Sequence, residues 1–167
     1  MTTPVRRRSY LAVVGGGRVP PADARRARAV GRAVAEAGAV LVCGGLGGAM
    51  AAACRGAHDA GGLTVGILPG ADRAAANRHV DVAIPTGLGE ARNALVVGAA
   101  DAVVAVAGEF GTLSEIALAL AAGTPVVGLG TWKLRRGGAP VAGVVTAHDP
   151  ALAVELALRL ARRRVRS

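Results

Sequence analysis

Large side chains are scarce in this chain of 167 residues. Tyrosine, phenylalanine and tryptophan occur once each, as Tyr10, Phe110 and Trp132, and Lys133 is the only lysine. Alanine, valine and leucine must therefore fill the core, and small side chains allow helices to pack closely on a sheet. The chain is long enough for one domain with a real core.

Metal-binding patterns are also missing. Cys43 and Cys54 lack the spacing of a metal site, and His58, His79 and His148 are scattered singly. We therefore expect no metal, and two buried, reduced thiols.

No targeting or membrane segment is evident. The basic residues before Tyr10 are not followed by an apolar signal-peptide region, and the longest uncharged apolar stretch, 116–132, is broken by a Gly-Thr-Pro turn at 123–125. We expect a cytoplasmic protein with no membrane association.

The net charge of +9 comes from the two ends of the chain. Eight arginines lie there, at positions 6, 7, 8, 159, 162, 163, 164 and 166, which leaves twelve basic and eleven acidic residues between them. No basic stripe with interleaved aromatic residues appears, so specific nucleic-acid binding is disfavoured, although the ends can bind polyanions weakly. We predict a flexible basic N-terminus at 1–9, a single domain at 10–160 and a basic C-terminal tail at 161–167.

Apolar runs of strand length alternate with helical patterns. The expected strands are 11–14, 40–43, 63–68, 80–84, 101–106, 126–129 and 144–146. The expected helices are 20–37, 49–60, 88–100, 112–122 and one that starts at 149–150, with a loop at 134–140. Strands without polar alternation are buried on both faces, so this order predicts an α/β fold. The fold is a doubly wound, mostly parallel Rossmann-like sheet of about seven strands with helices on both faces.

Four glycine-rich turns follow strand ends, at 15–17, 44–48, 87–89 and 108–111. The fold places such turns on one rim of the sheet, where ligands bind and free amides at helix N-termini attract anions. The G-x-G-x-x-G order and the P-loop pattern are both missing, which disfavours NAD binding and ATP hydrolysis. The rim therefore predicts a phosphate or nucleotide site, although each turn taken alone also fits tight helix–sheet packing.

The richest stretch is 107–115, where a buried strand ends at a glycine turn and a helix begins. Gly108, Gly111 and Thr112 predict an anion cradle, with Glu115 as a nearby acid. Thr112 and Glu115 alternatively form a capping box, in which the glutamate returns to the helix start.

Arg92 is the expected partner of Glu115 across the cleft. It follows a second glycine turn and lies near a helix start, where a cation is unfavourable unless a ligand anion offsets it. The alternative is an exposed arginine that pairs with Glu90.

Taken together, these motifs resemble the LOG-like group of Rossmann proteins, once called lysine decarboxylase-like, whose hallmark is P-G-G-x-G-T-x-x-E. Residues 107–115 read A-G-E-F-G-T-L-S-E at that hallmark, and residues 44–50, 66–70 and 92–93 also fit. The closest subgroup includes molybdenum-cofactor carrier proteins, and it is distinct from the cytokinin-activating phosphoribohydrolases. A decarboxylase role is unsupported, because no lysine is placed to anchor a cofactor.

The resemblance implies a phosphorylated nucleotide or pterin ligand, no required cofactor, and a homodimer or homotetramer. Arg92 and Glu115 take the catalytic positions of the hydrolases, which release a free base and ribose 5-phosphate from a nucleoside 5′-monophosphate. The ligand-binding positions are Gly16, Gly44, Gly45, Gly47, Gly48, Met50, Asn93, Gly108, Gly111 and Thr112.

Three residues depart from the hydrolase pattern. Ala107 replaces the motif proline, which we expect to be a mild change. Glu109 replaces a glycine and brings a carboxylate near the cradle, where it repels a phosphate unless it turns to solvent. Asn93 replaces a lysine, as in the carrier-like subgroup. The sequence thus favours ligand binding as in a molybdenum-cofactor carrier; a phosphoribohydrolase and a structural protein with a vestigial cleft are the alternatives.

Overall fold

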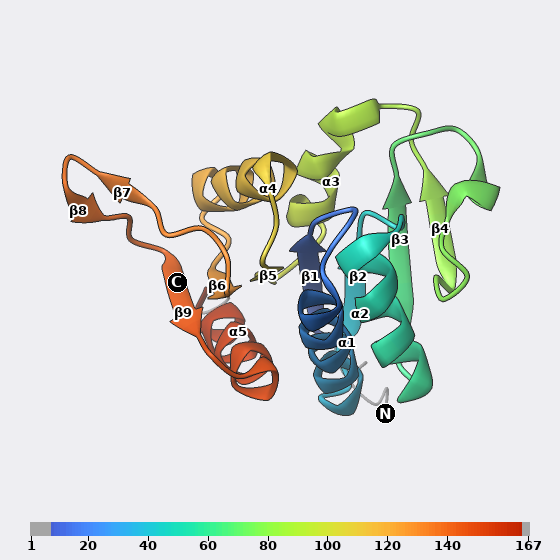
Figure 1. Cartoon of the computed structure of the whole chain (residues 1–167), viewed down its shortest axis with the longest axis horizontal. Helices are drawn as coiled ribbons and strands as arrows, with labels where there is room; N and C mark the ends of the chain where they lie inside the picture. Colours follow the sequence, from blue (N-terminus) through green and yellow to red (C-terminus); the bar gives the residue numbers. More distant parts are fainter. Residues whose placement is uncertain (1–7, 165–167) are drawn as a thin grey trace, which may run out of the picture.

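The computed structural model describes residues 8–164. Its strands are β1 (Tyr10–Gly15), β2 (Val40–Cys43), β3 (Thr64–Leu68), β4 (Val82–Pro85), β5 (Ala102–Val106), β6 (Val126–Leu129), β7 (Arg135–Arg136), β8 (Ala139–Pro140) and β9 (Val144–Ala147). Its helices are α1 (Pro21–Glu36), α2 (Gly48–Asp59), α3 (Asn93–Gly98), α4 (Phe110–Ala121) and α5 (Pro150–Arg164), with short 3₁₀ helices η1 (Arg73–Ala75) and η2 (Gly89–Arg92). Figure 1 shows their arrangement.

Seven strands form one sheet in the order β4-β3-β2-β1-β5-β6-β9. Every neighbouring pair in this sheet is parallel, which confirms the predicted doubly wound fold. The chain moves outward from β1 in one direction through β2, β3 and β4, and in the other through β5, β6 and β9. The reversal lies between β1 and β5, where Gly15 pairs with Val106. Ligands of open parallel sheets bind at such a switch point, outside the carboxyl ends of the strands.

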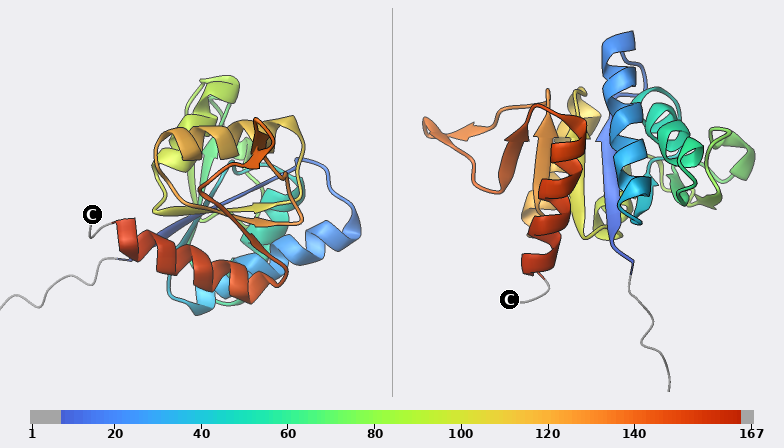
Figure 2. Two further views of the ribbon diagram at one scale, coloured as in Figure 1. Left: turned by 90° about the vertical axis from the view of Figure 1, so that its left-hand side faces the viewer. Right: turned by 90° about the horizontal axis from the view of Figure 1, so that it is seen from below.

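Helices cover both faces of the sheet, and β1 contributes to a core on each. Leu11 and Val13 join one hydrophobic cluster with residues of α1, α2 and α5, whereas Ala12 and Val14 join a second cluster with residues of α3 and α4. Figure 2 shows the sheet between these two layers. This alternation follows from the two-residue period of a strand.

Helices α1 and α2 pack backbone against backbone. A β-carbon added at Gly31 would lie 1.9 Å from the carbonyl oxygen of Ala53, and one added at Gly56 would lie 1.9 Å from that of Arg28. Only glycine allows this approach, because any side chain would overlap the facing backbone.

Several predicted boundaries were wrong. The helix expected at 88–100 is split into η2 and α3, and Gly89 within it has a φ of +58°, which does not continue a right-handed helix. The loop expected at 134–140 contains the antiparallel hairpin β7–β8.

The predicted C-terminal tail is partly helical, because α5 runs to Arg164. The Arg164 guanidinium donates to Thr124 Oγ1 at 2.9 Å and to the carbonyl oxygen of Ala122 at 3.1 Å, beyond the end of α4. Residues 1–7 and 165–167 of the predicted termini lie outside the described residues. None of the helices within residues 8–164 is both long and apolar enough to span a membrane.

Candidate functional site

A cavity of about 620 Å³ lies at the switch point of the sheet. We call it the cleft. It is lined by the turn after β1, by residues around the N-termini of α2 and α4, and by residues of η2 and the start of α3. These residues are Gly15, Gly16, Gly17, Arg18, Leu46, Met50, Glu90, Arg92, Asn93, Glu109, Gly111, Thr112 and Glu115.

The N-terminus of α4 faces this cleft with free donors. The helix begins at Phe110, and its first N–H groups have no partner within the helix. Gly111 and Thr112 lie in this first turn and line the cleft. Thr112 is 2% exposed, and its hydroxyl oxygen has no hydrogen-bond partner among the described residues. Free amides, the positive end of the helix dipole and an unpaired hydroxyl together favour an anion.

Arg92 brings a buried cation to the same cleft. It is 5% exposed, its Nε has no hydrogen-bond partner within residues 8–164, and no described carboxylate forms an ion pair with it. The alternative of an exposed arginine paired with Glu90 was therefore wrong. A buried guanidinium without a carboxylate at ion-pair distance among the described residues is costly, and a ligand anion in the cleft would lower that cost.

Gly44 makes room for the guanidinium. A β-carbon at this position would lie 2.2 Å from Arg92 Nη1 and 2.7 Å from Met50 Sδ. The arginine is thus held against the turn that follows β2, although that turn is distant from it in sequence.

Glu115 is the buried acid of the cleft, and it is 7% exposed. Burial raises the pKa of its carboxyl to about 7; the Arg92 cation lowers this pKa, and the Glu90 carboxylate raises it further. The capping-box alternative was wrong, because α4 starts at Phe110 and Glu109 is its N-cap residue. Thr112 is the third residue of the helix, so Glu115 is free to face the cleft.

Seven of the twelve predicted site residues line the cleft: Gly16, Met50, Arg92, Asn93, Gly111, Thr112 and Glu115. The structure thus brings together the two residues placed at the hydrolase catalytic positions and five of the ten placed at ligand-binding positions.

The other five, Gly44, Gly45, Gly47, Gly48 and Gly108, lie behind the lining residues. A β-carbon at Gly48 would lie 2.2 Å from the carbonyl oxygen of Gly16, and the next amide, of Ala49, donates to that oxygen at 2.9 Å. Gly108 has a φ of +96°, and its β-carbon would overlap Thr112. These glycines position the lining residues, and their direct contact with a ligand stays a prediction.

Five residues that line the cleft were not predicted as site residues: Gly15, Gly17, Arg18, Leu46 and Glu90. Each lies inside, or next to, a glycine turn that the sequence had singled out. Counting the neighbours of those turns would have found them. Glu90 also accepts a hydrogen bond from Asn93 Nδ2 at 3.4 Å, which links it to a predicted site residue.

Two departures from the hallmark have structural consequences. Ala107 has a φ of +46°, which a proline ring cannot adopt, so this substitution is not a mild change. Glu109 has an extended backbone, and its exposed side chain lies at the edge of the cleft.

The SLOG cluster4 family model matches residues 8–154. The chain belongs to this family. Its fold matches that of the molybdenum cofactor binding protein from the phototrophic bacterium Rippkaea orientalis with a TM-score of 0.82 and 34% identity, over 98% of this chain and 100% of the other. The Moco carrier protein from Chlamydomonas reinhardtii matches with a TM-score of 0.83 and 35% identity, over 94% of this chain and 99% of the other.

The chain is also similar in sequence to a protein from Archaeoglobus fulgidus. That uncharacterised protein is 44% identical over 119 residues, which span 71% of this chain and 78% of the relative. The structural similarity to the cofactor binding protein extends over 98% of this chain, and the SLOG cluster4 match covers residues 8–154.

Proposed function

We propose that the cleft binds a phosphorylated small molecule and that the protein acts as a carrier, with the molybdenum cofactor as its candidate cargo. One observation carries the proposal: Arg92 and Thr112 line the same cavity, and each carries a buried polar atom, Arg92 Nε and Thr112 Oγ1, without a hydrogen-bond partner among the described residues. Buried polar groups are nearly always hydrogen-bonded, so a pair of unsatisfied donors around one cavity favours an external acceptor.

The phosphate is best placed at the start of α4. The free amides of Gly111 and Thr112 and the Thr112 hydroxyl supply three donors there. The guanidinium of Arg92 adds a charge and a further Nε donor. Glu115 has a pKa of about 7, so near neutral pH its protonated form can also donate to a phosphate oxygen.

The comparisons support this choice of ligand. Two solved structures with nearly full coverage are described as a molybdenum cofactor binding protein and a Moco carrier protein. Asn93 is also consistent with ligand binding as in the carrier proteins. Its side chain is neutral, unlike the lysine of the hydrolases, and it donates a hydrogen bond to Glu90. This leaves Arg92 as the buried cation among the described cleft residues.

A thermal-shift screen tests the proposal. The probes are isolated molybdenum cofactor, AMP and GMP, each at saturating concentration, with adenosine and guanosine as phosphate-free controls. We expect at least one phosphorylated probe to raise the melting temperature, and neither nucleoside to do so. The variant Arg136→Ala, on the exposed hairpin strand β7, should respond like the parent protein. No shift with any phosphorylated probe would remove the proposal.

A phosphoribohydrolase is the second candidate function. It is favoured by the presence of Arg92 and Glu115 in one cleft and by the raised pKa of Glu115, which suits an acid working near neutral pH. Incubation with AMP, GMP and CMP should then release free base, and Glu115→Gln should release none. Equal release by the parent and this variant would exclude Glu115 as the catalytic acid.

We also propose that a second copy of the chain covers the α3–α4 layer. Leu95 on α3 and Leu118 on α4 are 45% and 37% exposed, and Phe110 at the start of α4 is 79% exposed. Light scattering should give at least twice the monomer mass, and Leu95→Glu with Leu118→Glu should reduce it to that of one chain. A monomeric parent protein would contradict this. The cytoplasmic location stays a prediction.

A further inference from the structure

A second, separate hollow lies on the outer side of the α1–α2 pair, which Figure 1 shows side by side. It consists of two adjoining cavities of about 390 and 220 Å³ that share Arg25 and Arg28. We call them together the basic groove, because four arginines and a histidine line it. These residues are Arg25, Arg28, Arg32, Arg55 and His79.

The groove has an excess of positive charge. Asp59 is the one carboxylate among the residues that line the two cavities, and Glu36, which lies outside them, pairs with Arg32 at 2.9 Å. Asp59 pairs with Arg28 at 2.7 Å and with Arg55 at 3.9 Å, and the hydrogen bond from Arg28 lowers the pKa of its carboxyl. Arg25 makes no ion pair or hydrogen bond with another described residue. Negative charge from outside the chain is therefore favoured here.

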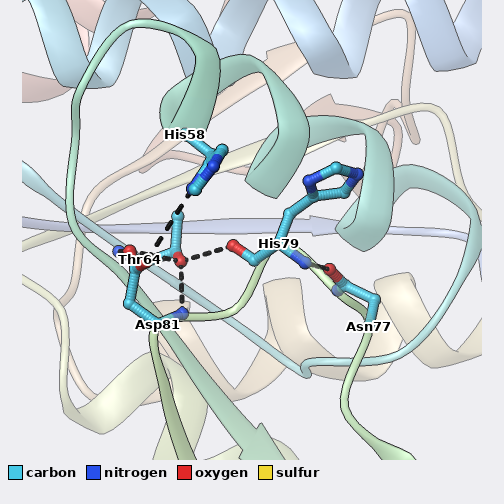
Figure 3. Close-up of polar contacts among 5 residues, drawn as sticks. All are labelled: His58, Thr64, Asn77, His79 and Asp81. Carbon is cyan, nitrogen blue, oxygen red and sulfur yellow. Dashed lines mark hydrogen bonds and ion pairs between the residues drawn. The ribbon is translucent and has the colours of Figure 1, made fainter.

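The pKa of His79 depends on the positive charge around the groove. Burial lowers the pKa of its imidazole, the charges of Arg78, His58 and Arg55 lower it further, and the Asp59 carboxylate raises it. Its backbone is fixed, since its N–H donates to Asn77 Oδ1 at 3.0 Å and its carbonyl accepts from the Thr64 hydroxyl at 2.7 Å (Figure 3). An anion bound in the groove should therefore raise the pKa of His79.

Small apolar residues also line the groove. They come from both helices: Ala24, Ala29, Ala51, Ala52 and Gly56. This lining follows from the close helix packing through Gly31 and Gly56. Small side chains leave room for an extended peptide, whose acidic side chains can reach the arginines on either side.

A nucleic acid fits the groove less well. No tyrosine, phenylalanine or tryptophan lines it, so exposed bases have no stacking platform. The first and last of the α1 arginines, at positions 25 and 32, are seven residues apart, or about 10 Å along the helix, and Arg28 lies between them. This length matches a short acidic segment better than the long phosphate track of a duplex.

The groove and the cleft are both lined by residues of α2. On α2, Met50 lines the cleft, whereas the next two residues, Ala51 and Ala52, line the groove. Asn77 Nδ2, two residues before His79, donates to the carbonyl oxygen of Leu46 at 3.0 Å, and Leu46 also lines the cleft. One hydrogen bond thus links the segment before His79 to a turn that lines the cleft.

We propose that the basic groove docks an acidic segment of a partner protein. The proposal goes beyond the ligand-binding function and does not depend on what the cleft holds. Charge complementarity between exposed groups gives fast and salt-sensitive association more than high affinity, which suits a transient partner.

The test uses a labelled hexaglutamate peptide, with hexaglutamine as the neutral control, and fluorescence anisotropy at low ionic strength. We expect only hexaglutamate to bind. Arg25→Gln and Arg55→Gln should each weaken binding about threefold, which is typical of an exposed charge pair. Arg136→Gln carries the same charge change outside the groove and should leave affinity unchanged. In NMR titrations, hexaglutamate should raise the pKa of His79.

Three results would overturn the proposal. One is equal binding, or equal failure to bind, of hexaglutamate and hexaglutamine. Another is equal weakening by Arg25→Gln and Arg136→Gln, which would mean nonspecific charge attraction. The third is tighter binding of a twelve-nucleotide oligothymidylate with the same dependence on Arg25, which would identify a nucleic-acid surface instead. Arg92→Ala separates the two proposals, since it should remove cleft binding and leave hexaglutamate binding intact.

Discussion

The cleft and the basic groove both present arginines to an anion, but these arginines differ in how far they are exposed to solvent. Arg92 in the cleft is 5% exposed and has no described carboxylate partner, whereas Arg28 and Arg55 in the groove are about half exposed and share Asp59. A desolvated charge interacts strongly and is poorly screened, while exposed pairs are weak and sensitive to salt. The cleft is thus built to hold a ligand, and the groove to meet a partner briefly.

The largest expected effect comes from removing the buried cation. Arg92→Ala should weaken binding of the phosphorylated ligand by about 100-fold or more, because losing one partner of a buried charge pair costs about 2–5 kcal/mol. Calorimetry measures this loss. Arg25→Ala should leave cleft affinity unchanged. A loss of less than about threefold for Arg92→Ala would remove the contrast between the two regions.

The second effect concerns stability. Burial raises the pKa of Glu115 to about 7 from an ordinary value of 4.5, so the folded state favours the protonated acid. The unfolded chain ionises first as pH rises, so stability falls between pH 4.5 and about 7 by about 3 kcal/mol and is flat above. Glu115→Gln should remove this slope in urea unfolding measured from pH 5 to 8.

Glu155→Gln provides the matched control, because Glu155 is exposed on α5 and pairs with Arg159. Its unfolding should keep the slope of the parent protein. If the slope survives in Glu115→Gln, the buried acid is not its source.

A smaller effect should follow from filling space behind the arginine. Gly44→Ala adds a β-carbon 2.2 Å from Arg92 Nη1, so the guanidinium must shift. We expect cleft affinity to fall about tenfold, which corresponds to roughly 1.4 kcal/mol, while hexaglutamate binding is unchanged. Gly98→Ala on α3 is the control, since nothing lies within 4 Å of its added carbon and it does not line the cleft. Equal losses for both variants would show that the position of Arg92 does not matter.

The smallest expected difference between the cleft and the groove is in how their binding affinities depend on salt. Raising ionic strength from about 0.05 to 0.5 M should weaken hexaglutamate binding several-fold and change cleft affinity much less, since buried charges are screened little. Parallel anisotropy and calorimetry series measure both. Equal salt dependence would mean that the charges in the cleft are as exposed to solvent as those in the groove.

The sequence predicted the cleft better than the groove for a physical reason. Turns at the carboxyl ends of parallel strands must share an edge, so the meeting of Gly16, Arg92 and Glu115 followed from strand order. The start of α4 did not follow, because it depends on positive φ values at Ala107 and Gly108 that no pattern specified. The groove depends on the mutual rotation of two helices, which Gly31 and Gly56 set through backbone contact.

The most direct measurement is a calorimetric cycle that combines two changes, removal of the ligand's phosphate and removal of the Arg92 side chain. The parent protein and Arg92→Ala are each titrated with the best phosphorylated ligand from the screen and with its dephosphorylated form. We predict that Arg92→Ala costs the phosphorylated ligand about 100-fold in affinity and the dephosphorylated form almost nothing. Equal losses for both forms would show that Arg92 does not hold the phosphate and would contradict the account.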